Sequence, residues 1–189
     1  MAFGRELSLN PMIGKTPITF NTMIVHNGDS ILITSFRAYI VIPTSTMNSI
    51  HLLDMEEGLA CSIPDEAESL ILGIDSIQTV RTDFMGVLDP IHGMFWTWNS
   101  GYINVKIEGT SQRSTQRNHL FQMHLGGFAA PYQTSLPLRI PRTIPIKLSI
   151  DIAPCMDALL NNHQGTLMSP GKHAHELMRI LQQSIIIEQ

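Results

Sequence analysis

The sequence lacks any long apolar run. No stretch approaches the roughly 18 consecutive apolar residues that a membrane-spanning helix needs. The first five residues also contain no hydrophobic signal segment. Two interpretations stay open: either the protein remains in the cytosol, or the chain begins after a signal peptide or lipoprotein anchor has been removed.

Charge is scarce, and basic charge most of all. Charged residues make up 15% of the 189 residues, and 12 Lys and Arg stand against 16 Asp and Glu, for a net charge of -4. The basic residues are scattered and form no stripe that would neutralise a phosphate backbone, so nucleic acid is excluded as a partner. A hydrophobic fraction of 43% indicates a normal packed core, and the length suits a single domain over residues 1–189.

Cysteine and the common catalytic motifs are nearly absent. The two cysteines, Cys61 and Cys155, lie far apart and belong to no CxxC or Cys/His zinc spacing. We therefore expect two free thiols rather than a disulfide. The sequence has no Gly-x-Ser-x-Gly elbow, no His-Glu-x-x-His, no P-loop and no dinucleotide fingerprint, so we predict that the protein is not an enzyme.

The sequence does contain strand-like alternation. In the stretch 101–108, Ile103, Val105 and Ile107 alternate with polar residues and a tyrosine, and the stretch 144–152 alternates in the same way. Further strands are expected at residues 18–25, 31–42, 49–53, 69–74, 120–125 and 135–140. With turn residues between them, these segments predict an all-β fold: an antiparallel β-sandwich of about eight strands.

Helix is expected only in the last third of the chain. One or two turns fit residues 156–161, and a longer helix fits residues 170–185, with Ser169 as N-cap and Pro170 in the first position. Its apolar stripe consists of Ala174, Leu177, Met178, Leu181 and Ile185. We expect this C-terminal α-helix to dock on the sandwich through that stripe.

Both tryptophans lie in one unusual segment, residues 83–109. Trp96 and Trp98 are two residues apart, which in a strand points them to the same face. Turn residues, Asp89-Pro90 and His92-Gly93, precede them. Two interpretations stay open: the aromatic rings plug one end of the core, or they line a pocket near His92.

Several motifs in and around this segment resemble one known family. They are Gly73-Ile74-Asp75-Ser76, Gly86-Val87-Leu88-Asp89-Pro90, Gly93-Met94-Phe95-Trp96-Thr97-Trp98-Asn99-Ser100-Gly101-Tyr102, His51-Leu52-Leu53-Asp54, Phe121-Gln122-Met123-His124-Leu125-Gly126-Gly127 and Met168-Ser169-Pro170-Gly171. In this order they resemble the MbnP-like family over nearly the whole chain, and the match looks closest to a branch found in Bacteroidetes-type bacteria.

The resemblance implies a location, a metal and a partner. Members of the family are secreted, periplasmic or lipid-anchored, which favours a cell-envelope location. Some bind copper through histidines and work with a di-haem, peroxidase-like partner that oxidises a tryptophan to kynurenine. Here that reactive element corresponds to Trp96 or Trp98. The resemblance thus implies extracytoplasmic copper binding or handling.

Three of the eight histidines are candidate copper ligands: His51, His92 and His124. A neutral imidazole is a good ligand for copper. His51 and His124 match family landmarks and are preferred, while His92 is nearest in sequence to the tryptophans. The alternative function is a non-metal module that binds carbohydrate or protein through a platform formed by Trp96, Trp98 and Tyr102.

Overall fold

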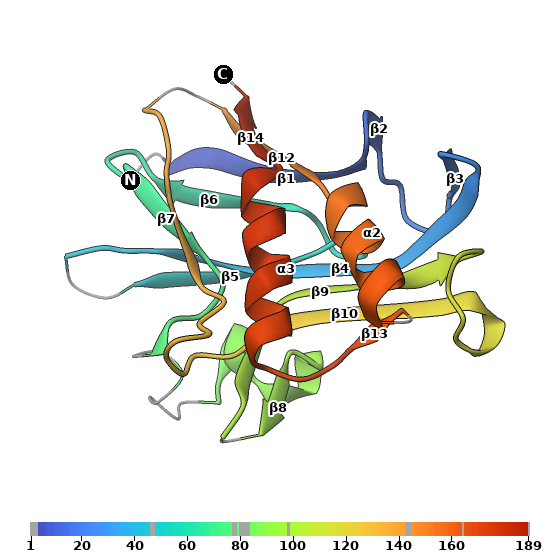
Figure 1. Cartoon of the computed structure of the whole chain (residues 1–189). Helices are drawn as coiled ribbons and strands as arrows, with labels where there is room; N and C mark the ends of the chain where they lie inside the picture. The colour runs from blue at the N-terminus through green and yellow to red at the C-terminus, as the bar shows by residue number, and fades with distance from the viewer. Residues whose placement is uncertain are drawn as a thin grey trace.

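A computed structural model of the chain describes residues 4–45, 48–76, 79, 84–97, 99–142, 145–163 and 165–188 (Figure 1). The strands are β1 (Gly4–Ile13), β2 (Thr16–Pro17), β3 (Met23–His26), β4 (Asp29–Ile42), β5 (Ser49–Asp54), β6 (Ala60–Pro64), β7 (Ser69–Leu72), β8 (Phe95–Thr97), β9 (Gly101–Ser111), β10 (Leu120–Gly126), β11 (Leu136–Arg139), β12 (Ile146–Asp151), β13 (Thr166–Leu167) and β14 (Ile185–Glu188). The helices are α2 (Ala153–His163) and α3 (Lys172–Gln183), and short 3-10 turns lie at Gly86–Leu88, Pro90–His92 and Arg117–His119.

The described strands form a small and a large sheet. The small sheet has the order β14-β12-β1-β2, with β6 also paired to β1. The large sheet has the order β11-β7-β4-β9-β10-β13, with β3 and β5 on β4 and β8 on β9. The long strand β4 is its central member, since it pairs with β3, β5, β7 and β9. Helices α2 and α3 lie side by side across the sheets (Figure 1).

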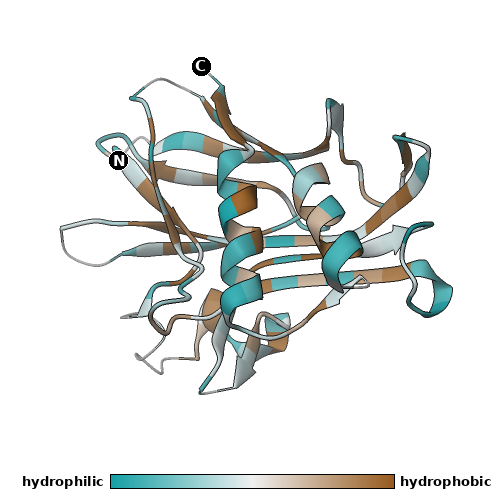
Figure 2. Ribbon diagram, in the orientation of Figure 1, coloured by the Kyte–Doolittle hydropathy of each residue, from teal (hydrophilic) through white to brown (hydrophobic). Residues whose placement is uncertain are grey.

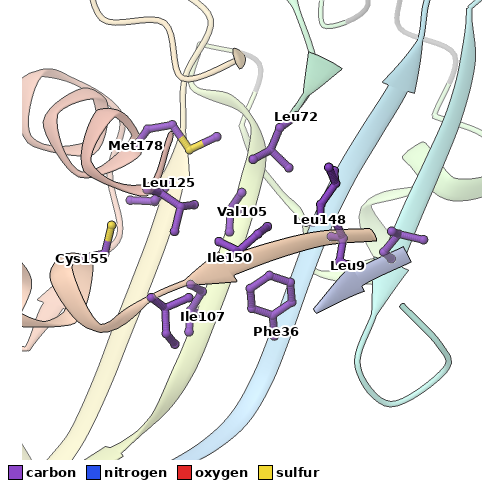
Figure 3. Packing of buried hydrophobic residues seen from close by; sticks show 14 of the residues in the cluster. Leu9, Phe36, Leu72, Val105, Ile107, Leu125, Leu148, Ile150, Cys155 and Met178 are labelled. Atoms are coloured by element: carbon purple, nitrogen blue, oxygen red, sulfur yellow. The ribbon is translucent and has the colours of Figure 1, made fainter. Parts of the chain in front are cut away.

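The main core lies between the two sheets. Leu148 and Ile150 of the small sheet are buried with Phe36 and Ile107 of the large sheet, and Met178 of α3 is buried in the same cluster, near Leu125 (Figure 3). We call the side of the large sheet that faces this core its inner face. The expected all-β sandwich with a C-terminal helix is therefore confirmed.

The sequence predicts an antiparallel sandwich, but two strand pairs in the described ranges are parallel. β1 pairs with β12 in parallel, and so does β10 with β13. A parallel pair needs a long crossover connection, and all strands of the large sheet except β13 lie between β1 and β12 in the chain. The sequence analysis also predicts no strand before residue 18. Buried Arg5 and Pro11 take inward positions in β1, so its alternation is hard to recognise.

The opposite side of the large sheet, its outer face, is only partly covered. A second cluster of buried residues lies there, under the segment 84–97. It comprises Tyr39, Val41, Ile74, Leu88, Met94, Tyr102 and Ile103. Ile103 is expected on the same face as Val105 and Ile107, but those two residues belong to the main core. A β-bulge opposite Leu125 and Gly126 shifts the register and turns Ile103 outward.

The C-terminal helix docks as expected but has different ends. Ala174, Leu177, Met178 and Leu181 are all buried in the main core, and Figure 2 shows polar and apolar positions along the same helix. The N-cap is Gly171, not Ser169. Pro170 instead lies against Gly127: a Cβ built on Gly127 would lie 2.8 Å from the Cβ of Pro170.

The helix also ends before the last residue of the expected stripe. Ile185 starts β14, because three consecutive β-branched isoleucines favour a strand.

At the other end of the chain, residues 18–22 form a turn rather than the start of a strand: Asn21 has a φ of 53° and Thr22 N–H donates to Thr19 O. Cys61 and Cys155 are both free, as predicted. Nowhere in the described ranges is a helix long and apolar enough to cross a bilayer.

Candidate functional site

A row of charged side chains crosses the outer face of the large sheet. The strand register aligns Asp54 of β5 with Arg37 of β4, Arg37 with Lys106 of β9, and Lys106 with His124 of β10. Residues directly opposite each other in a ladder project to the same face. These four residues, here called the charged row, therefore share the face that carries the segment 84–97.

His124 ends the charged row and is the most buried of its members, at 4% exposure. Its Nε2 lies 2.7 Å from Oε1 of Glu108. Its Nδ1 is buried and has no hydrogen-bond partner among the described residues. An unpartnered buried ring nitrogen is costly in a folded protein. Either ring nitrogen of an imidazole can bind a metal ion when it carries the lone pair.

Glu108 is held in place from two further sides. Gln122 donates a hydrogen bond from its side-chain nitrogen to Glu108 Oε1 at 3.1 Å, and Lys106 Nζ lies 3.7 Å from the same oxygen. The hydrogen bond from His124 is the largest cause that lowers the pKa of Glu108 to about 2, while partial burial opposes it and Lys106 supports it. The carboxylate is thus fixed in its ionised form.

Trp96 lies on the same face, beyond His124. It is the bulged residue of β8, between the pairs Phe95–Tyr102 and Thr97–Gly101. A Cβ built on Gly126 would come within 2.8 Å of Cζ3 of its indole. Gly126 follows His124 by two residues in β10, about 7 Å along a strand. Trp96 is half-buried and packs on the second cluster, whereas the predicted Trp98 lies outside the described residues.

His92 also belongs to the outer face, but its ring bonds to the preceding 3-10 turn of the same segment. Its Nε2 lies 3.0 Å from Gly86 O, and its carbonyl accepts a hydrogen bond from Arg37 at 3.0 Å. The expected turn chemistry is confirmed: Asp89 accepts from Ile91 N–H at 2.9 Å, and Gly93 has a φ of 64°. A surface cleft of about 260 Å³ separates this turn from the strands, lined by Arg37, Leu52, Asp54, Glu57, Val87, Ile91 and His92.

His51 lies on the inner face and not beside His124. It pairs with Ile40, whose side chain is part of the main core, while Arg37 of the same strand projects outward. The ring of His51 lies 2.9 Å from Ser49 Oγ, and burial lowers its pKa. The structure therefore brings His92, His124 and Trp96 to one face and leaves His51 on the other.

The described residues form neither a complete metal-binding cluster nor the expected aromatic platform. No three His, Cys, Asp or Glu side chains within the described part of the chain form a cluster that could hold a metal ion. Tyr102 is buried, with its hydroxyl donating to Leu88 O, so it is not part of an exposed aromatic platform. Sequence reasoning also misses Glu108, although its two-residue spacing from Lys106 already places both on one strand face.

Comparison with known proteins gives one consistent result. The family model MbnP matches residues 4–169. Among solved structures, MbnP from Methylosinus trichosporium is similar, with a TM-score of 0.55 and 13% sequence identity over 81% of this chain and 77% of that one. At this identity the structural likeness shows the fold alone. None of the curated proteins compared matches this chain.

Proposed function

This chain belongs to the MbnP family, and from that premise we propose that it binds or handles copper in the cell envelope. The family is associated with copper, which supports a general copper-associated role. Its members are secreted or periplasmic proteins, which supports export of this one. We propose a binding function with no catalytic activity of its own.

The observation that carries this proposal is the unpartnered Nδ1 of His124. A neutral imidazole nitrogen is a good copper ligand, and this one is buried without a partner beside an ionised carboxylate. Copper needs further donors, and the described His, Cys, Asp and Glu do not supply a complete set. The proposed site therefore includes Trp96, whose indole lies farther along the same face.

Oxidation of Trp96 or Trp98 to kynurenine would supply the missing donors. In this reaction the bond between the two pyrrole carbons of the indole breaks and each carbon gains an oxygen atom. Hydrolysis then releases one of these carbons as formate and leaves an aniline nitrogen and a carbonyl oxygen. Peroxide is the oxidant, reduced to water, and a di-haem, peroxidase-like partner carries the electrons. A half-buried ring at the end of the sheet supports this role for Trp96.

The first test is a titration with Cu(I) against a competing chelator, after treatment with the cognate haem protein and peroxide. We expect binding tighter than about 1 µM, which corresponds to about -8 kcal/mol. The variant His124→Ala should bind more weakly than wild type. The matched control is His26→Ala, which removes a histidine from a distant hairpin. Binding no tighter than micromolar in the treated wild type would sink the proposal.

The second test is intact-mass spectrometry of the same samples. Kynurenine formation replaces one carbon by one oxygen and adds about 4 Da per tryptophan. Protein produced without the partner should show unmodified tryptophan and only weak copper binding. If treatment leaves the mass unchanged in wild type, the assignment of a reactive tryptophan is wrong. The variant Trp96→Phe shows whether a gain in mass belongs to Trp96 or to Trp98.

A further inference from the structure

The two ring nitrogens of His124 have different surroundings. Nε2 faces Glu108 at 2.7 Å, and Nδ1 has no hydrogen-bond partner within the part of the chain that the structure describes. A carboxylate can only accept a hydrogen bond, so the nitrogen that faces it carries the proton. In a neutral ring the other nitrogen then carries the lone pair. The environment of His124 therefore favours the Nε2–H tautomer.

We propose that Glu108 is a positioning residue that fixes this tautomer and thereby makes Nδ1 the copper-ligating atom of His124. The inference rests on the proposed function and adds to it the identity of the donor atom and the residue that selects it. Histidine ligands commonly donate their second N–H to a carboxylate, which orients the ring and raises its basicity. Glu108 stands in that relation to His124.

The strands around Glu108 explain why it can hold the ring. Glu108 lies opposite Gln122 in the β9–β10 ladder, and Lys106 lies opposite His124. The carboxylate and the imidazole are thus diagonal neighbours on one face, a distance that long side chains span. Gln122 and Lys106 both contact the same oxygen that faces His124. The carboxylate is therefore held from its own strand and from the facing strand.

The burial of the pair supports the same assignment. The side chain of His124 is 5% exposed and that of Glu108 is 24% exposed. Solvent can therefore reach the carboxylate more easily than it can reach the ring, and Nδ1 does not obtain its missing partner from bulk water. A ligand donor that is oriented before binding loses less conformational freedom when the metal ion arrives.

The tautomer can be measured directly in the metal-free protein by nitrogen NMR of the histidine rings. We expect a protonated Nε2 and an unprotonated Nδ1 for His124 in wild type. Glu108→Ala should shift His124 toward a mixture of both tautomers, and Glu108→Gln, which keeps an acceptor oxygen, should retain more of the original form. Glu56→Ala is the matched control, because Glu56 also borders the charged row but pairs with Arg37. Circular dichroism checks that each variant is folded.

Cu(I) is then added to the same samples, since its closed shell does not broaden the signals. We expect the Nδ1 signal of His124 to shift while Nε2 stays protonated. Glu108→Ala should weaken Cu(I) binding about 10- to 100-fold, the usual effect of losing such a partner, and Glu56→Ala should leave it unchanged. If copper binds but displaces the proton from Nε2, or if Glu108→Ala changes neither tautomer nor affinity, the inference is overturned and the proposed function stands. If no copper binds to treated wild type, the proposed function fails and the assignment of Nδ1 as a ligand fails with it.

Discussion

The two faces of the large sheet are made by the same strands but have different chemistry. On the inner face, β4 contributes Phe36, Ala38 and Ile40, all fully buried in the main core. On the outer face, the same strand contributes Arg37, which pairs with Asp54 at 2.6 Å. Neighbouring residues therefore serve the core and the site in turn. A register slip of a single residue would exchange the two faces.

The comparison shows where this fold leaves room for chemistry. The small sheet and the helices cover the inner face, where the main core lies. The outer face is covered at one end by the segment 84–97 and is more open at the other, where Met23 and Val25 are 55% and 73% exposed. Partly buried polar groups lie between these ends. They are shielded enough to interact strongly and open enough to meet a ligand.

The largest effect is expected from a charge placed in the inner core. Leu181→Asp puts a carboxylate at a position with 0% exposure in α3 and should destabilise the fold by several kcal/mol, because the charge has no partner there. Gln183→Asp, at the exposed end of the same helix, should cost less than about 1 kcal/mol. Denaturant unfolding measures both. Equal stability of the two variants would contradict the docking of α3.

A smaller effect is expected at the charged row. Asp54→Ala removes the partner of Arg37 and the acceptor of Glu56 N–H. We expect a loss of about 1–3 kcal/mol, the cost of leaving partly buried polar groups without partners. The exposed pair Arg142–Glu68 provides the contrast, since Glu68→Ala should change stability by less than about 1 kcal/mol. If the two variants lose the same stability, burial does not strengthen the row.

The outer face should also respond to acid. The pKa of Glu108 is lowered from 4.5 to about 2. A carboxyl with a depressed pKa stabilises the fold above its unfolded pKa, and that contribution is lost as the pH falls through the folded pKa. The stability advantage of wild type over Glu108→Gln should therefore shrink as the pH falls from about 4.5 to about 2. Unfolding curves at several pH values measure it, and a constant difference would rule out an ionised Glu108 carboxylate that accepts the hydrogen bond from His124.

The smallest effect is expected at the open end of the outer face. Val25→Ser removes an apolar side chain that is 73% exposed and should change stability by no more than about 0.5 kcal/mol. The same substitution type at a buried position, Val41→Ser, provides the comparison because it removes packing from the second cluster. Thermal melts of the two variants are sufficient. A large loss from Val25→Ser would mean that the open end is covered in solution.

The sequence predicts the inner face better than the outer one, for a physical reason. Burial of one face imposes a repeat of apolar residues along the sequence, every second residue in a strand and every three to four residues in a helix. For that reason β4, β9, β10 and the apolar stripe of α3 are recognisable in the sequence. Pairing between strands is not local. His51 and His124 both match family landmarks, but only the register shows that they project to opposite faces. Glu108 becomes the partner of His124 only once β9 and β10 are known to be neighbours. The bulges that turn Ile103 outward and redirect Trp96 also leave no simple period.

Gly126 limits which substitutions the site can accept, because it lies directly under the ring of Trp96. A methyl group there would meet Tyr102 O at 2.4 Å and the indole of Trp96 at 2.8 Å. Because the first contact is with backbone, even alanine would force the strands apart or move the ring. Shrinking Trp96 would relieve only the second contact. No single substitution at position 126 is therefore expected to fit without moving the neighbouring strand. The glycine thus fixes where an aromatic ring can lie at this end of the sheet.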